Sequence, residues 1–177
     1  MFRDNSLIPS EAIQLAALGF LAEGPRHYGE LAAAIRHFTS CVAGPSLELM
    51  GTSLELLRYE GLATADGNAA VENGMLSITE AGRQNLGALL KARLRAPLGD
   101  LNRLALLLKL RFLHVLSADE RQEQMVLIAQ SIESELARLR DLRRTEETAP
   151  ASFVEWLDHD IAALEARLRS LRVSAAG

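Results

Sequence analysis

The sequence predicts a mainly α-helical protein with a small β-hairpin, and three observations support this fold class. Apolar residues make up 49% of the 177 residues but aromatic residues only 5%, so the core must consist mostly of Leu and Ala, which favour helices over sheets. Apolar residues recur at spacings of three and four along most of the chain. Between residues 62 and 78, two short strand-like stretches flank a polar, turn-rich segment, DGNAAVENG.

Three short helices are predicted before this hairpin, over residues 10–22, 28–39 and 46–60. Ser46 is a start signal for the third helix, because its hydroxyl can accept a backbone N–H at a helix N-terminus. Gly61 is a stop signal, because glycine adopts a left-handed turn without steric cost. The third helix is amphipathic, with an apolar stripe formed by Leu47, Met50, Leu54 and Leu57.

Two strands are predicted after the third helix, over Leu62–Ala65 and Met75–Ile78. Three helices followed by two strands are the arrangement of a helix-turn-helix domain with a β-wing. Thr79 is predicted to cap a fourth helix, which the breakers of the segment APLG interrupt. We therefore expect a winged helix-turn-helix domain over residues 1–96 and a helical domain over residues 97–177.

The second domain is predicted to be entirely helical. Residues 101–116 form a helix that is apolar almost all round and must be buried on several sides. Ser117 and Glu120 form a capping box that opens a long helix, and a second long helix follows the polar stretch RRTEETAP. Because each long helix carries one narrow apolar seam, we expect an antiparallel helical hairpin that pairs with a second copy of the chain.

Several classes of protein are not expected from this sequence. The single cysteine, Cys41, permits no disulfide within the chain and favours a reducing compartment. The apolar run 101–116 is too short and too charged to span a membrane, and residues 1–11 lack a signal-peptide core, so a cytoplasmic protein is expected. The sequence contains no nucleophile motif and no phosphate-binding loop, so neither an enzyme nor a cofactor is expected. His37 and Cys41 alone are weak evidence for a metal site, so none is expected.

Three segments of the chain resemble the PadR-type winged-helix transcriptional regulators. Residues 18–25, LGFLAEGP, followed by HYGEL at 27–31, are similar to the family's "LGLLAEGPxHGYEL". Residues 54–62, LELLRYEGL, are similar to "LKRLEEEGLI", and residues 77–83, SITEAGR, are similar to "YxLTEAGR". The order and spacing of the three segments agree with the family over roughly residues 10 to 90. The resemblance implies a dimeric DNA-binding regulator, usually a repressor, which in some members responds to a small aromatic ligand.

Six residues are candidates for DNA contacts. A phosphate contact and a solvated surface position are both open for each arginine. The candidates are Arg26, Arg36 and Arg58 for phosphates, and Ser46, Thr52 and Ser53 for the DNA backbone or bases. Trp156, in the last helix, is either an anchor of the dimer interface or a stacking wall for a flat ligand.

The charge of the first domain leaves a second function open. Residues 1–90 contain five arginines and no lysine against ten acidic residues, a balance of −5, and the wing segment 66–74 has no basic residue. DNA affinity comes largely from neutralising phosphates. The alternatives are therefore a homodimeric regulator that binds double-stranded DNA through the helix 46–60, and a winged-helix module that has lost DNA binding and binds a protein partner.

Overall fold

The computed structural model describes residues 7–43, 50–65, 74–94, 100–146 and 149–176. The chain divides into two compact units, which are described separately. The first unit comprises residues 1–94 and 99–116, and the second comprises residues 95–98 and 117–177. The structure is mainly helical with one small sheet, which confirms the predicted fold class.

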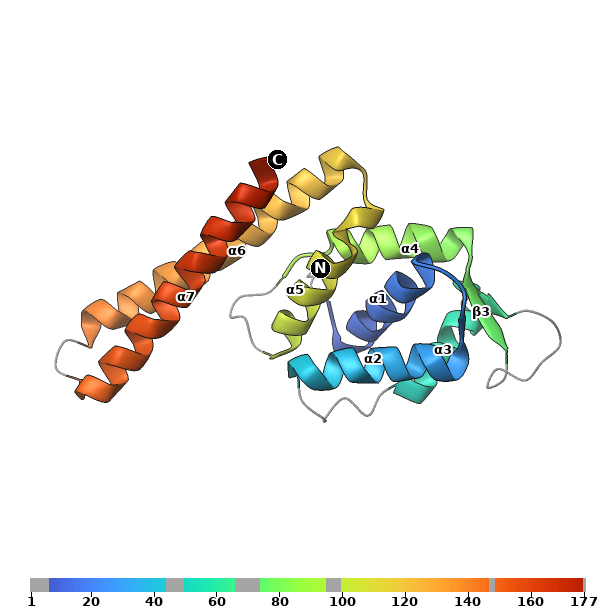
Figure 1. Ribbon diagram of the computed structural model, residues 1–177, viewed down its shortest axis with the longest axis horizontal. Coiled ribbons are helices and arrows are strands. Elements are labelled where there is room, and N and C mark those ends of the chain that lie inside the picture. Colours follow the sequence, from blue (N-terminus) through green and yellow to red (C-terminus); the bar gives the residue numbers. More distant parts are fainter. Residues whose placement is uncertain (1–6, 44–49, 66–73, 95–99, 147–148, 177) are drawn as a thin grey trace, which may run out of the picture. The chain divides into compact units, whose positions relative to one another are not determined.

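The first unit contains most of the elements. Its order along the chain is α1 (Pro9–Ala22), β1 (Arg26–His27), α2 (Tyr28–Ala43), α3 (Met50–Tyr59), β2 (Ala63–Ala65), β3 (Met75–Ile78), α4 (Glu80–Lys91), α5 (Asp100–Phe112) and the short 3-10 helix η2 (Leu113–Val115). Helix α1 is the centre of this unit, since it contacts α2, α3, α4, α5 and β3 (Figure 1). Its side chains from Leu15 to Leu18 are fully buried, so it has almost no polar face.

The sheet has three antiparallel strands in the order β1-β3-β2, where the sequence predicted two. Strands β2 and β3 form the predicted hairpin, with Ala63 opposite Ile78 and Ala65 opposite Leu76. Strand β1 adds Arg26 opposite Leu76 on the other side of β3. A strand of two residues is too short to show the alternation of apolar and polar residues that identifies strands in a sequence. Of the predicted wing loop, residues 66–74, all but Gly74 lie outside the described residues.

Helix α4 begins as the sequence predicts. The Thr79 hydroxyl accepts the backbone N–H of Gly82 at 3.0 Å, and it also donates to the carbonyl oxygen of Gly61 at 2.7 Å. The same threonine therefore caps α4 and fastens it to the turn that ends α3. Gly82 lies so close to this turn that an added Cβ would be 2.1 Å from the Leu62 carbonyl oxygen.

Helix α5 belongs to the first unit, which moves the boundary between the two units away from residue 96, where the sequence placed it. The helix packs on α1 and α2 and buries Leu104, Leu108 and Phe112 completely. A helix with apolar residues on nearly every side needs several neighbours, and here the winged helix-turn-helix itself supplies them. Lys109 on α5 is also buried, and its ammonium group donates a hydrogen bond to the Ala92 carbonyl oxygen at the end of α4.

The second unit is a helical hairpin of α6 (Ala118–Thr145) and α7 (Ala151–Ala176). Ser117 and Glu120 form the predicted capping box at the start of α6. The buried apolar side chains of the two helices are Met125, Ile128, Ile132 and Leu136 on α6 and Leu157, Leu164 and Leu168 on α7. Ion pairs join Arg140 to Glu165 at 2.6 Å and Arg143 to Asp158 at 2.8 Å, so the helices run antiparallel as predicted.

Candidate nucleic-acid interface

Helix α3 is the second helix of the helix-turn-helix, and two leucines fix its rotation. Leu54 and Leu57 are 1% and 2% exposed, on a helix that contacts α1, α2 and β2. This is the inward orientation that the apolar stripe predicts for these two residues. Leu47 lies outside the described residues, and the side chain of Met50 is not described. Gly61 then adopts φ 73°, which allows the chain to turn from α3 into the β2–β3 hairpin.

Among the described side chains of α3, the solvent-exposed ones are Glu55, Leu56 and Tyr59. Leu56 is 48% exposed and Tyr59 is 90% exposed, although both side chains are largely apolar. Arg58 is only half-exposed, because it lies beside the buried stripe rather than opposite it. Leu56 and Tyr59 are not among the contacts predicted from the sequence, although their spacing identifies them. They lie four and seven residues after Thr52, on the same side of a helix.

The six candidate DNA contacts do not all fall within the described part of the structure. Ser46 lies outside the described residues, and Thr52 and Ser53 lie on α3 with side chains that are not described. Arg36 is exposed on α2 and forms no ion pair with the described residues. Arg36 on α2 and Arg58 on α3 thus come from the two helices of the helix-turn-helix.

Arg26 is held by contacts within the first unit. Its guanidinium donates to the Glu23 carboxylate at 3.4 Å and to the Phe20 carbonyl oxygen at 3.4 Å. It also lies over the Phe20 ring, 5.4 Å from the centroid. Glu23 pairs with Arg111 of α5 as well, so one carboxylate connects β1 to α5. These contacts give Arg26 a structural role that sequence spacing did not reveal.

Positive charge in the first unit is concentrated in the part of the chain that follows β3. Residues 1–80 contain four basic residues against ten acidic ones, whereas the rest of the first unit, residues 81–94 and 99–116, contains six basic residues against one acidic one. The second group includes the exposed residues Arg83, Arg93 and Arg103. They belong to α4, α5 and the segment after α4. Helix α4 packs on α1, and α5 packs on α1 and α2. Any attraction between α3 and phosphates therefore depends on a few individual arginines.

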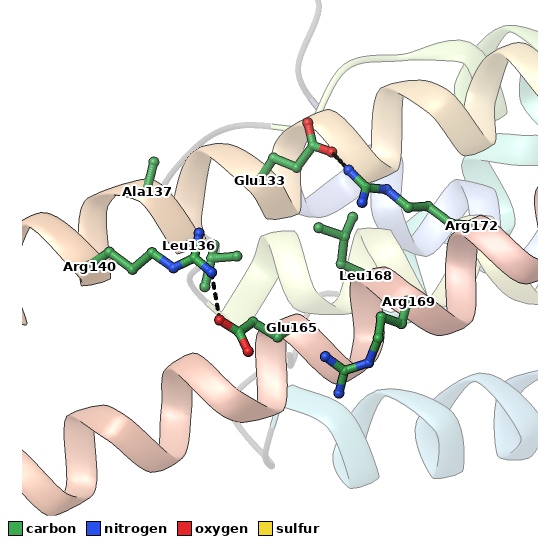
Figure 2. A pocket seen from close by; sticks show the side chains of 8 residues that line it. All are labelled: Glu133, Leu136, Ala137, Arg140, Glu165, Leu168, Arg169 and Arg172. Carbon is green, nitrogen blue, oxygen red and sulfur yellow. Dashed lines mark hydrogen bonds and ion pairs between the residues drawn. The ribbon is translucent and has the colours of Figure 1, made fainter.

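The second unit carries a groove of about 430 Å³ between α6 and α7. Leu136 and Leu168 provide its apolar part, and ion pairs Arg140–Glu165 and Glu133–Arg172 bridge the helices across it (Figure 2). The guanidinium of Arg169 also lines the groove but takes part in neither ion pair (Figure 2). Trp156 is 63% exposed and is not among the residues that line the groove.

Two other kinds of site receive no support from the described residues. His37 and Cys41 are both exposed on α2, and in the described ranges no three His, Cys, Asp or Glu side chains cluster as metal ligands. None of the described helices combines the length and the apolar character needed to cross a bilayer.

Comparison with known proteins identifies regulators of similar sequence or structure. A family model described as "Putative AphA-like transcriptional regulator" matches residues 2–175. A solved structure of Bacillus subtilis PadR with operator DNA aligns at 18% identity and a TM-score of 0.40, covering 92% of this chain and 97% of that chain. A second PadR structure, with p-coumaric acid, aligns at 18% identity and a TM-score of 0.38, covering 97% of each chain. Curated proteins give no match.

Proposed function

Because the chain belongs to the AphA-like family of transcriptional regulators, we propose that it binds operator DNA as a homodimer and represses transcription. This family supports a regulator rather than an enzyme, as the sequence predicted from its resemblance to PadR-type regulators. The proposed regulator would work in the cytoplasm, which is the compartment expected from the sequence.

The exposed face of α3 is the observation that carries this proposal. Leu54 and Leu57 anchor the helix from behind, so the face with Glu55, Leu56 and Tyr59 is presented to solvent. An α-helix fits the major groove of B-DNA, which is about 12 Å wide. In our proposal α3 lies in that groove, with Arg36 and Arg58 contacting phosphates and Ser46, Thr52 and Ser53 contacting the DNA backbone or bases.

The α6–α7 hairpin is proposed as the dimerisation element. Two helices that pack along one seam leave most of their surfaces uncovered, and here Leu142, Phe153 and Trp156 are exposed by 38–63%. Large aromatic side chains are enriched where proteins associate, which makes Trp156 the proposed anchor of the interface. A two-fold dimer would present two copies of α3 to half-sites about 34 Å apart, or a multiple of that distance.

A small aromatic effector is the third part of the proposal, and the groove between α6 and α7 supports it. A flat ring could lie on Leu136 and Leu168 while Arg169 binds a carboxylate. Trp156, the stacking residue expected from the sequence, does not line this groove. p-Coumaric acid, which is present in one PadR structure, is the first ligand to test.

Charge favours a second candidate function, a protein-interaction module that no longer binds DNA. The acidic excess of residues 1–80 and the exposed Glu55 on α3 would repel phosphates and attract a basic protein surface.

Selection of DNA from a random-sequence pool by the purified protein separates the two functions. The regulator is expected to enrich a two-fold symmetric sequence and to bind it more weakly as the salt concentration rises. Fluorescence polarisation over a salt series measures that dependence, and light scattering measures the mass of the free protein. A pool that shows no enrichment, from a protein that binds no DNA even at low salt, would rule out the regulator and support the interaction module.

A further inference from the structure

The most exposed large apolar side chain of the described residues lies on the helix that we place on DNA. Tyr59 is 90% exposed, and Leu56, one turn earlier on the same face, is 48% exposed. Apolar side chains on a helix surface contribute little to stability while they remain in water. An exposed apolar pair on a binding face therefore indicates that the partner presents an apolar group to it.

The rotation of α3 determines which residues face outward. Successive residues of an α-helix are about 100° apart, so a residue on the side opposite the buried Leu54 and Leu57 must point to solvent. Leu56 and Tyr59 satisfy that condition, and Glu55 lies next to them. Arg58 is partly buried on the flank of this face.

The floor of the major groove offers only one apolar group. Thymine carries a C5-methyl there, whereas the other bases present hydrogen-bond donors and acceptors. An aliphatic or aromatic side chain opposite a donor or acceptor would remove water from it without replacing the hydrogen bond. The same side chain opposite a thymine methyl buries apolar surface on both partners.

We propose that Leu56 and Tyr59 form an apolar reading surface that contacts thymine methyl groups in the major groove, an inference that rests on the proposed DNA-binding function. The operator would then be distinguished by the positions of its thymines. Arg36 and Arg58 would supply phosphate contacts that are independent of sequence. This assignment explains how a helix with one arginine and one acidic residue among its described positions could select a sequence.

Replacement of thymine by deoxyuridine tests this proposal, because it removes only the C5-methyl group. DNA that the full-length chain has selected from a random pool is synthesised with each thymine replaced in turn. The dissociation constant for the wild-type protein is expected to rise about fourfold for each contacted methyl group. Thymines at positions that α3 does not reach are expected to tolerate the change.

Variants of the protein assign the effect to these two side chains. In the single variants Leu56→Ala and Tyr59→Ala, deoxyuridine at the thymine that the removed side chain contacts is expected to cause no further loss of affinity, since that contact is already absent. Tyr59→Phe is expected to retain the sensitivity, because the ring remains. Leu110→Ala is the matched control, since Leu110 is also exposed, at 36%, but lies on α5.

The possible outcomes separate this proposal from the function on which it rests. If the protein selects DNA but no deoxyuridine substitution weakens binding, the proposed thymine contacts are wrong. The proposed DNA-binding function is still supported in that case. If Leu110→Ala removes the sensitivity as well as Leu56→Ala does, the effect is not local to α3 and the assignment is wrong. If no DNA is selected while Leu56→Ala abolishes binding to a protein partner, the proposed function and this inference fail together.

Discussion

The ring of Phe112 on α5 occupies the space that any side chain at position 19 of α1 would need. A Cβ atom added to Gly19 would lie 2.5 Å from the Cδ2 and Cε2 atoms of that ring. The ring also meets Phe20 edge-on, with centroids 5.3 Å apart. This close approach of α5 to α1 makes α5 part of the first unit.

Replacement of Gly19 by alanine should therefore destabilise the first unit. Gly19→Ala forces the Phe112 ring or α5 to move, and overpacking of this kind costs about 1–3 kcal/mol. Urea denaturation followed by circular dichroism measures the change. Gly87→Ala on α4 is the matched control, because no atom lies within 4 Å of its added Cβ. The control should be neutral or up to about 1 kcal/mol more stable, and equal losses in both variants would contradict the close contact.

Removal of the Thr79 hydroxyl should destabilise the junction between the hairpin and α4. Thr79→Ala leaves the Gly82 N–H and the Gly61 carbonyl oxygen without their partner, at a cost of about 1 kcal/mol. Thr79→Ser retains the hydroxyl and should recover most of that loss. Thermal unfolding of the two variants in parallel provides the comparison. Identical melting temperatures for the two variants would mean that the hydroxyl contributes nothing.

Burial of Lys109 should make stability depend on pH in the alkaline range. Burial lowers the pKa of Lys109 from 10.5 to about 8. Between these values the unfolded chain binds a proton that the folded chain lacks, so the free energy of unfolding rises with pH across this window. The rise is on the order of 3 kcal/mol, because each pKa unit corresponds to about 1.4 kcal/mol. Below pH 8 both states are protonated, and the full cost of burying the charge remains.

Lys109→Met isolates this contribution from the other groups that titrate. The variant keeps the apolar stem but has no charge, so its stability relative to the wild type should be highest below pH 8 and should fall toward pH 10.5. Urea denaturation of both proteins at several pH values gives the difference. A difference that stays constant from pH 7 to 10.5 would show that Lys109 keeps its ordinary pKa.

The arginines of the first unit should separate into DNA-contacting and structural residues. Arg36→Ala and Arg58→Ala should each reduce the slope of log K against log salt concentration by about 1, because each loses one phosphate contact. Arg26→Ala should leave that slope unchanged and lower the melting temperature, since Arg26 is bound to Glu23 and lies over Phe20. Fluorescence polarisation at several salt concentrations and thermal unfolding measure the two effects.

Arg103→Ala provides the control for the position of the DNA. Arg103 is exposed on α5, among the residues that carry most of the positive charge. If α3 binds the DNA, this variant should keep the salt dependence of the wild type. A reduced slope for Arg103→Ala together with an unchanged slope for Arg58→Ala would place the phosphates against α5 instead.

Features encoded by neighbouring residues were predictable from the sequence. The Thr79 cap, the capping box of Ser117 and Glu120, and strand β3 at Met75–Ile78 agree with the structure because each depends on residues within one turn or one strand. The inward stripe of α3 follows in the same way from the spacing of Leu54 and Leu57. These local signals were sufficient for the fold class and for the order of the longer elements, but not for the two-residue strand β1.

The tertiary structure decided which side chains remain available for function. Arg26 has the same charge as Arg36 in the sequence, but only the fold places it between Glu23 and Phe20. Arg58 was a candidate contact on α3 from the sequence, whereas packing leaves it partly buried and exposes Leu56 and Tyr59. Helical periodicity determines which residues share a face. Contacts between distant segments, such as Phe112 against Gly19, determine which faces are covered, and no local pattern encodes those contacts.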